Sequence, residues 1–391
     1  MPLSGLRVID LTRVLSGPFC TMLLGDLGAD VVKIEPPEGD SVRRQGAVRD
    51  GLSWYFAAFN RNKRALRLDL KRPEARDVLA RLIAGADVLV ENFRPGVLAR
   101  LGFDEDRLRA LRPSLVVCSI NGFGSTGPYR DRPAFDFIAQ ALSGFMSMNG
   151  MPDGPPLRSG LPVSDLIAGL YAALAIAAAA PRARASGQGE RVEVSLTNAM
   201  ASFLSYAAAN YLATGTAPAR GGNDHPIAAP YGVFPTRDGE LALAIPDDAF
   251  FARLAAALGA PDLARDPLYA SGAARVANRA RINAIVGGRL AAETTAHWVA
   301  RLNAAGVPCG PVASIAEALS DPQLIAQEMV LEIPHPGHGN VRMLGFPMKL
   351  ARQPCRVRRP APEPGQHAEE ILAEAGYTTD ERTALRAAGV L

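Results

Sequence analysis

The chain has 391 residues, of which 48% are hydrophobic and 21% are charged. This balance is typical of a globular protein, and it excludes intrinsic disorder, collagen-like repeats and small disulfide-bonded scaffolds. The length is too great for one ordinary hydrophobic core and predicts at least two domains. The net charge of +3 is too small for a nucleic-acid-binding surface, so no nucleic-acid partner is expected.

The cysteines and the longest apolar run bear on the cellular compartment. The four cysteines are far apart and form no C-x-x-C pair, which indicates reduced thiols in a cytoplasmic protein: Cys20, Cys118, Cys309 and Cys355. The first residues lack a basic segment followed by an apolar run, so no signal peptide is expected. The longest apolar run, Leu166 to Ala180, is shorter than the roughly 18–20 residues of a membrane span. It predicts a buried helix and no membrane partner.

The first 150 residues alternate between strand and helix patterns. Short apolar runs predict strands at 6–11, 30–34, 65–70, 87–90 and 115–120. Helices are expected at 18–28, with Pro18 in the first turn, and at 73–84, where apolar residues recur at helical spacing. Apolar strands separated by helices favour a parallel sheet covered on both faces. The fold class predicted is therefore α/β, with a Rossmann-like large domain.

The second half of the chain changes character after residue 213. A helix is expected to about residue 180, a strand at 191–195 and one long helix at 196–213. A Gly- and Pro-rich loop at 214–230 precedes a predicted hairpin at 231–245, which turns at Asp238-Gly239. Helical patterns between about 248 and 319 indicate a smaller α+β domain. Strands at 329–333 and 341–344, an extended Pro- and Arg-rich segment at 352–366 and two short helices follow.

The sequence Gly122-Phe-Gly124-Ser-Thr-Gly127 matches G-x-G-x-x-G, a dinucleotide-binding pattern, and follows a predicted strand. It follows the fifth strand instead of the first. Pro128 and the charged run Tyr129-Arg-Asp-Arg-Pro133 occupy the place of the apolar helix that this fingerprint requires. We therefore interpret the motif as a glycine-rich turn.

Asp165 lies directly before the most apolar helix of the chain. One reading is structural, because Ser164 or Asp165 would cap that helix, a contact worth about 0.5–2 kcal/mol. The other reading is functional: a carboxylate at a positive helix end stays ionised at neutral pH and acts as a nucleophile. Gly169, one turn later, leaves room for a neighbouring backbone to approach closely.

Basic residues follow the ends of several predicted strands: Lys71, Arg72, Arg94 and Arg100. Ligands of an open parallel sheet bind beyond the carboxyl ends of its strands, so this set suits a phosphorylated ligand. For any single arginine a solvated surface is the better interpretation, and only the shared position after strands favours a ligand site. The pair His335 and His338 has no third ligand near it in the sequence, so no metal site is expected. His225, in a loop, either contacts substrate or has no role.

Together, seven stretches resemble the class III CoA-transferases, the formyl-CoA and carnitine type, over essentially the whole chain. They are Leu3-Ser-Gly-Leu-Arg-Val-Ile-Asp-Leu11, Ser16-Gly-Pro18, Leu27-Gly-Ala-Asp-Val-Val-Lys-Ile-Glu35, Asn60-Arg-Asn-Lys63, Val90-Glu-Asn-Phe-Arg-Pro-Gly96, Ser119-Ile-Asn-Gly-Phe-Gly124 and Val163-Ser-Asp-Leu-Ile-Ala-Gly169. The resemblance implies a large CoA-binding domain of residues 1–215 and 335–391 and a small domain of residues 225–330. It also implies an interlocked homodimer, in which the segment at 352–366 is a wrapping arm.

The resemblance assigns roles to residues by position. Asp165 falls on the catalytic aspartate of the family, which forms an acyl anhydride and then an aspartyl-CoA thioester. No metal and no tightly bound cofactor are implied, since coenzyme A and acyl-CoA are substrates. Pro36 replaces an arginine that often follows the second strand. The implied CoA contacts are Leu15, Ser16, Leu68, Lys71, Asn92, Phe93, Arg94, Arg100, Pro133, Ala134, Phe135 and Asp136.

Departures from the family pattern bear on the substrates. The glycine tetrad of formyl-CoA transferases is replaced by Gly221-Gly-Asn-Asp-His-Pro226, which argues against formate as the acceptor, and the loop 221–231 is a candidate lid. The related 2-methylacyl-CoA racemases need a histidine where Phe135 stands, and phenylalanine takes no proton. A racemase and a non-catalytic CoA-binding protein stay as alternatives. A dicarboxylate such as succinate is the preferred acceptor, with Arg43, Arg44 and His225 as candidate partners for its second carboxylate. A bile acid, carnitine or an aromatic acid would fit the same motifs.

Overall fold

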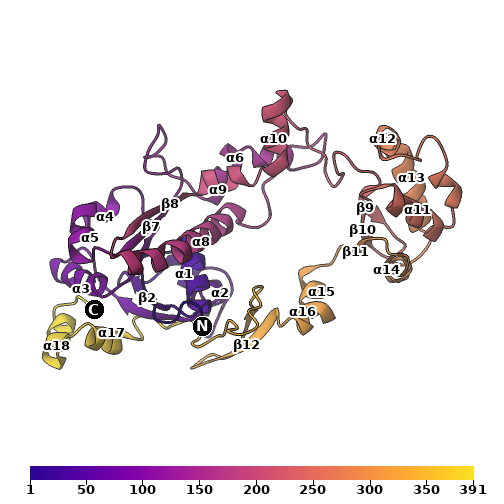
Figure 1. Ribbon diagram of the computed structural model, residues 1–391. Helices are drawn as coiled ribbons and strands as arrows, with labels where there is room; N and C mark the ends of the chain where they lie inside the picture. The colour runs from indigo at the N-terminus through magenta and orange to yellow at the C-terminus, as the bar shows by residue number, and fades with distance from the viewer. The chain divides into compact units, whose positions relative to one another are not determined.

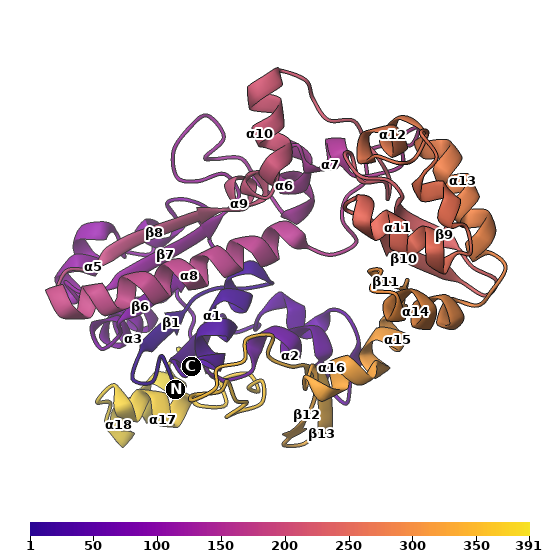
Figure 2. The ribbon, with the colours of Figure 1, turned by 45° about the vertical axis from the view of Figure 1, so that its right-hand side comes forward.

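The computed structural model describes residues 1–391, and the chain folds into two compact units (Figures 1 and 2). The first unit contains Met1–Phe145, Arg158–Ala213 and Gln323–Leu391, so both chain ends belong to it. The second unit contains Met146–Leu157 and Thr214–Pro322.

A six-stranded sheet, parallel at every pairing, forms the centre of the first unit, with the order β5-β2-β1-β6-β7-β8. The α/β class and all six predicted strands are confirmed. Only the third strand differs appreciably, because it begins at Lys63 and a turn at 69–72 follows it. The strands are β1 (Arg7–Asp10), β2 (Asp30–Glu35), β5 (Lys63–Arg67), β6 (Val88–Glu91), β7 (Val116–Asn121) and β8 (Glu190–Ser195).

Helices bury both faces of this sheet, since alternate residues of a strand point to opposite sides. Val8 and Val31 lie in a core with α1 (Ser16–Asp26), α8 (Val163–Ser186) and α9 (Leu196–Ser202). Ile9 and Val32 lie in a second core, with α3 (Pro73–Ala84), α5 (Glu105–Leu111) and α17 (Ala368–Glu374). Figures 1 and 2 show α8 running beside β7 and β8.

Helix α8 is longer than the apolar run that predicted it. Its buried face includes Ile167, Ala168 and Gly169, whereas Leu170 and Leu174 on the other side are exposed, Leu174 at 67%. The expectation of a buried helix is therefore right for one face only. By length and composition α8 is able to cross a membrane, a property that core helices of other proteins share.

The long helix expected at 196–213 is broken in two. Helix α9 ends at Ser202 and α10 (Ser205–Thr214) follows. Ser205 has φ = +52°, a left-handed conformation that no α-helix continues through. The other elements of this part of the chain are η1 (Ser41–Arg44), β3 (Val48–Arg49), β4 (Leu52–Ser53), α2 (Trp54–Asn60), α4 (Val97–Arg100), α6 (Asp136–Leu142) and α7 (Phe145–Met148).

The last residues of the chain return to the first unit. The two predicted strands are confirmed as β12 (Val330–His335) and β13 (Gly339–Leu344), which form an antiparallel pair, and α18 (Thr379–Ala387) follows α17. The segment 352–366 contains no helix or strand. Asn62 accepts the backbone N–H of Arg358 and donates to the carbonyl of Arg356, so this segment lies on the first unit of its own chain.

The second unit contains a three-stranded antiparallel sheet in the order β11-β10-β9. Strands β9 (Tyr231–Pro235) and β10 (Glu240–Ala244) are the predicted hairpin. β11 (Cys309–Pro311) interrupts the region that the sequence predicts as helical. The remaining elements are α11 (Asp248–Ala257), η2 (Pro261–Ala264), α12 (Gly272–Ala277), α13 (Arg279–Leu290), α14 (Thr295–Ala304), α15 (Ile315–Ser320) and α16 (Pro322–Ala326), the last of which crosses into the first unit.

Candidate active site

Asp165 lines a cavity of about 380 Å³ in the first unit. The cavity lies beyond the carboxyl ends of the strands, since Asn92 follows β6, Asn121 ends β7 and Leu196 follows β8. This is the edge at which ligands of open parallel sheets bind. The location therefore supports Asp165 as a functional residue.

The start of α8 is held by a residue from another helix. Asp136 of α6 accepts hydrogen bonds from the backbone N–H of Ser164, at 2.9 Å, and from its hydroxyl, at 2.7 Å. The helix has no side-chain cap of its own, so the expectation that Ser164 or Asp165 caps it is wrong. The Asp136 carboxylate therefore binds the first turn of α8, in which Asp165 lines the cavity.

Gly169 brings α1 close to α8. A β-carbon built on Gly169 would lie 2.6 Å from the backbone oxygen of Ser16 and 3.0 Å from the ring of Phe19. The predicted close backbone approach is confirmed. It places Ser16, the first residue of α1, beside Asp165, whose carboxyl group the Ser16 hydroxyl hydrogen-bonds.

The carboxyl group of Asp165 is less acidic than its position at a helix start predicts. Burial raises its pKa from 3.8 to about 7, the Asp136 carboxylate also raises it, and the hydrogen bond from Ser16 lowers it. The expectation of a carboxylate fully ionised at neutral pH is therefore wrong, because desolvation and a like charge outweigh the helix end. Tyr55 of α2 also lies near Asp165, whose charge contributes to raising the pKa of the tyrosine, after burial.

A fully buried ionic network underlies α1. Lys63 Nζ donates to Asp10 Oδ2 at 3.1 Å, to the Pro18 carbonyl at 3.0 Å and to Asn60 Oδ1 at 2.9 Å. Asp10 also accepts hydrogen bonds from the hydroxyl of Thr21, at 2.7 Å. Burial lowers the pKa of Lys63 to about 8 against the attraction of Asp10. The network connects β1 and β5 to the first turn of α1, and so to the wall of the cavity.

The predicted CoA contacts divide into two groups. Eight of them line the cavity with Asp165: Leu15, Ser16, Asn92, Phe93, Arg94, Pro133, Ala134 and Phe135. Four do not: Leu68 is buried in the sheet core, Lys71 and Arg100 are exposed elsewhere, and Asp136 is buried against Ser164. Phe135 presents its ring to the cavity and is 74% exposed.

Sequence reasoning missed three arginines of the cavity wall, Arg13, Arg130 and Arg132. The signal was present for two of them in the charged run 129–133, which the sequence analysis used only as evidence against a nucleotide-binding helix. The structure confirms the glycine-rich turn that precedes this run, since the next helix, α6, begins only at Asp136. The cations of this wall suit a ligand that carries phosphates or carboxylates.

Of the candidate contacts for a second carboxylate, Arg43 and Arg44 belong to the first unit but do not line this cavity. Arg43 donates to both oxygens of Glu35, at 2.7 and 2.6 Å, and to the Pro362 carbonyl. Arg44 donates to the Glu38 carbonyl. His225 belongs to the second unit, where its ring lies 4.8 Å from that of Tyr231. Because its guanidinium is committed to Glu35 and the backbone, Arg43 is a structural residue.

The two histidines of the β12–β13 turn have an acidic neighbour that the sequence did not indicate. Glu363 accepts from His338 Nε2 at 2.8 Å, so the expectation of no third candidate ligand is wrong. Both ring nitrogens of His335 lie near carbonyl oxygens, those of Pro336 at 3.0 Å and Ala361 at 2.8 Å. These contacts hold the hairpin to the segment 352–366.

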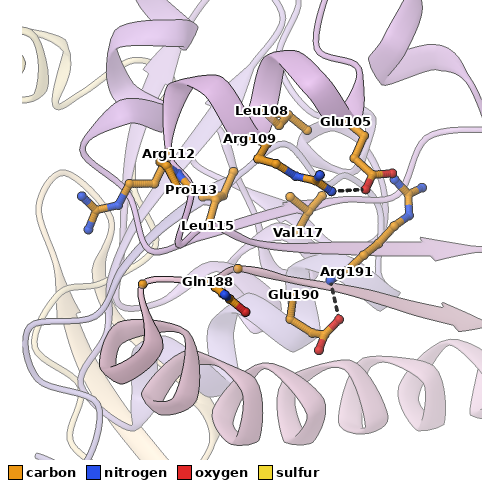
Figure 3. Close-up of a pocket in the computed structure, with 12 residues that line it drawn as sticks. Glu105, Leu108, Arg109, Arg112, Pro113, Leu115, Val117, Gln188, Glu190 and Arg191 are labelled. Atoms are coloured by element: carbon orange, nitrogen blue, oxygen red, sulfur yellow. Dashed lines mark hydrogen bonds and ion pairs between the residues drawn. The ribbon is translucent and has the colours of Figure 1, made fainter.

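A larger cavity, of about 500 Å³, lies at the amino ends of β7 and β8 (Figure 3). Its wall includes Val117, Gln188 and Arg191, and its Arg109 is paired with Glu105 at 2.8 Å. This is the edge of the sheet opposite to that of Asp165. Although this cavity is larger, the Asp165 cavity is the better candidate for the active site, because it lies at the carboxyl ends of the strands.

Comparisons with known proteins agree with this geometry. The family model described as CoA-transferase family III matches residues 3–368. The chain is 41% identical to a succinate–glutarate CoA-transferase of Agrobacterium fabrum, covering 98% of this chain and 97% of the relative. It is 42% identical to an acetyl-CoA:oxalate CoA-transferase of Acetobacter aceti, covering 90% and 89%.

A solved structure shows the same fold over nearly the whole chain. The crystal structure of a CAIB/BAIF family protein from Brucella suis has a TM-score of 0.88 and 38% sequence identity, covering 96% of this chain and 99% of that one. The match extends over both units. The chain therefore belongs to CoA-transferase family III, and it is an enzyme that transfers coenzyme A from an acyl-CoA thioester to a carboxylic acid.

Proposed function

We propose that the enzyme exchanges coenzyme A between dicarboxylic acids and that Asp165 is the nucleophile. An oxygen of the Asp165 carboxylate attacks the thioester carbonyl of the donor, the C–S bond breaks, and CoA leaves as the thiolate. The thiolate then attacks the aspartyl carbonyl of the anhydride, which releases the donor acid and forms an aspartyl-CoA thioester. The acceptor carboxylate then attacks the aspartyl-CoA thioester, and the same two steps run in reverse to give the acceptor's CoA thioester. The reaction therefore consumes no ATP and needs no metal.

The position and the acidity of Asp165 carry this proposal. It is the acidic side chain of a cavity at the carboxyl edge of the sheet, and its pKa is raised to about 7 by burial and by Asp136. A carboxylate that is poorly solvated is more basic, and therefore a stronger nucleophile, than one in water. Exclusion of water matters for a second reason, because water hydrolyses an anhydride.

The dicarboxylate class is supported by the names of similar enzymes. Besides the succinate–glutarate and oxalate enzymes, the chain is 37% identical to a succinyl-CoA:mesaconate CoA-transferase of Haloarcula hispanica. We propose succinyl-CoA as the donor. The arginines of the cavity wall supply the positive charge that the anionic ligands need.

The same cavity contains most of the residues that we propose to contact coenzyme A. We propose that the eight predicted contacts that line it bind CoA, together with Arg13, Arg130 and Arg132. Lys71 and Arg100 stay proposals for contacts to the distal phosphates.

We further propose that the loop 221–231 is a lid and that His225 contacts the acceptor. The His225→Ala substitution then raises the KM of the acceptor and leaves that of the donor unchanged. Arg279 donates to the carbonyl oxygens of His225 and Ala228 and holds this loop on α13.

We propose that the enzyme is an interlocked homodimer, with the two units as its CoA-binding and smaller domains. Exposed apolar side chains gather on four neighbouring helices of the first unit: Phe137, Ile138 and Leu142 on α6, Leu170 and Leu174 on α8, Phe203 just after α9, and Tyr206, Tyr211 and Leu212 on α10. Apolar surface of this extent on one unit is typical of a protein–protein interface. Sedimentation should give twice the chain mass, and a monomer at micromolar concentration would contradict the proposal.

We place the enzyme in the cytoplasm. All four cysteines are free thiols, which suits a reducing compartment.

The test of the proposed function is an exchange assay. Succinyl-CoA is mixed with glutarate, oxalate, mesaconate or acetate, and the new acyl-CoA is separated by chromatography. We expect rapid transfer to at least one dicarboxylate, slower transfer to acetate, and loss of all transfer in Asp165→Ala with CoA binding retained. A racemase would instead incorporate solvent deuterium at the α-carbon of a 2-methylacyl-CoA, and a silent CoA-binding protein would do neither.

A further inference from the structure

Val14 has a strained backbone at the wall of the cavity. Its φ is +70°, in the left-handed region that β-branched residues almost never occupy. It lies two residues before Ser16, and both residues line the cavity with Asp165. Strain of this kind persists only where the surroundings enforce it, and it gathers at functional sites.

Three backbone N–H groups before α1 are held by three side chains from separate segments. The N–H of Thr12 donates to Asp10 at 2.8 Å, and that of Arg13 donates to Asn92 at 3.0 Å. The N–H of Val14 donates to the carboxylate of Asp40, at 3.2 and 3.3 Å to its two oxygens. The strained residue is thus the one that Asp40 holds.

Asp40 is itself fixed by a buried ion pair. Lys33 Nζ lies 3.1 Å from Asp40 Oδ2 and 2.8 Å from the carbonyl oxygen of Thr12, and both side chains are almost fully buried. The N–H of Asp40 donates to Glu35 at 2.9 Å. One ammonium group therefore binds both the loop and the carboxylate that holds the loop.

We propose that the buried Lys33–Asp40 ion pair is a positioning device that keeps Val14 in its left-handed conformation and so sets Ser16 and the start of α1 against Asp165. Without the pair, Val14 relaxes to negative φ and displaces the next two residues. The inference rests on the proposed nucleophilic role of Asp165. Lys33 and Asp40 then affect the rate although neither residue contacts substrate.

Glycine at position 14 provides the test, because glycine adopts positive φ without strain. The variants are Asp40→Ala, Asp40→Ala with Val14→Gly, and Asp40→Ala with Val14→Ala. Val14 also packs against the core around Phe56, so Val14→Ala reproduces the lost packing, while its β-carbon still disfavours positive φ. The matched control is Asp26→Ala, which breaks the buried ion pair to Arg61 at the other end of α1.

We expect Asp40→Ala to lower kcat/KM for succinyl-CoA with glutarate by about 30-fold. Adding Val14→Gly to Asp40→Ala should raise kcat/KM again by about tenfold. Adding Val14→Ala to Asp40→Ala should restore no activity. Adding Val14→Gly to Asp26→Ala should not raise the kcat/KM of that control. The groups that face Asp165 are Asp136, Ser16 and Tyr55, besides the cavity arginines. Because Ser16 lowers the pKa of Asp165, its displacement should move the acid limb of kcat/KM to higher pH in Asp40→Ala and in Asp40→Ala with Val14→Ala, but not in Asp26→Ala.

Calorimetry with coenzyme A alone gives a second readout that needs no turnover. The affinity should fall in Asp40→Ala and recover with Val14→Gly. Equal recovery with glycine and alanine, or none with glycine in either assay, overturns the inference. An inactive wild-type enzyme would contradict the proposed function instead, while the calorimetric comparison would still decide the positioning role.

Discussion

Gly169 of α8 and Ser16 of α1 are in contact so close that no side chain fits between them: a β-carbon on Gly169 would lie 2.6 Å from the Ser16 backbone oxygen. Helices α1 and α8 thereby cross at the point where the hydroxyl of Ser16 reaches the Asp165 carboxyl group. The contact joins the loop before α1 to the start of α8, which are 150 residues apart in the chain.

The Gly169→Ala substitution should force these helices apart. We expect a loss of about 1–3 kcal/mol in the free energy of unfolding. We also expect kcat to fall by more than tenfold, because Ser16 moves away from Asp165. Urea denaturation and the exchange assay measure the two effects. Gly288→Ala in α13, where nothing lies within 4 Å of the added carbon, is the matched control and should not destabilise the protein. Equal effects of the two substitutions would contradict the account.

The rate should depend on pH through Asp165. Only its ionised form is a nucleophile, so kcat/KM should fall tenfold per pH unit below a midpoint near pH 7. Asp136→Asn removes a like charge and keeps an oxygen for Ser164, so the midpoint should move to lower pH. Ser16→Ala removes a hydrogen bond to the carboxylate, so the midpoint should move to higher pH. Shifts in the same direction would contradict the assigned causes.

Stability should depend on the same group. The pKa of Asp165 is higher in the folded chain, about 7, than its ordinary value of 3.8, so the folded state binds the proton more tightly. This contribution to stability is present at low pH and is lost as the pH rises from about 4 to about 7. Asp165→Asn should therefore stabilise the protein at pH 8.5 by about 2 kcal/mol, less than the full shift implies because water reaches the cavity, and should have little effect at pH 4. Thermal unfolding at the two pH values measures this difference.

Lys63 should be indispensable for stability. Its removal leaves Asp10 buried without its nearest cation, and breaking a buried pair on one side costs about 3–5 kcal/mol. We expect this loss for Lys63→Met at pH 7, measured by urea denaturation. The double variant Lys63→Met with Asp10→Leu should lose less than Lys63→Met alone. Lys349→Met, which removes an exposed lysine, should change stability by no more than about 0.5 kcal/mol.

The sequence predicted the sheet well because its inner strands, such as β2 and β6, are buried on both faces. The runs Val88-Leu-Val90 and Leu115-Val-Val-Cys118 are apolar throughout, and such runs among helices indicate a covered parallel sheet. The helix break at Ser205 was missed because no glycine or proline marks it, and only the backbone conformation shows it.

The cavity brings Asp165 together with eight of the twelve predicted CoA contacts, but the acidity of Asp165 was not predictable. Asp165 was found from its motif and its place before α8. Its pKa is raised first by burial and then by Asp136, which is 29 positions earlier in the chain, and both effects arise only through the fold. The same holds for Glu363, which no local spacing connects to His338. The pairing of Arg43 with Glu35 was also missed, because no motif marks it.

The central claim is that the Asp165 carboxylate bonds covalently to the acyl group and to coenzyme A. The most direct measurement is mass spectrometry of the peptide containing Asp165 after mixing the enzyme with succinyl-CoA and quenching in acid. We predict a mass increase on Asp165 equal to a succinyl or a coenzyme A adduct, absent in Asp165→Asn. An unmodified peptide from an enzyme that turns over under the same conditions would contradict the account.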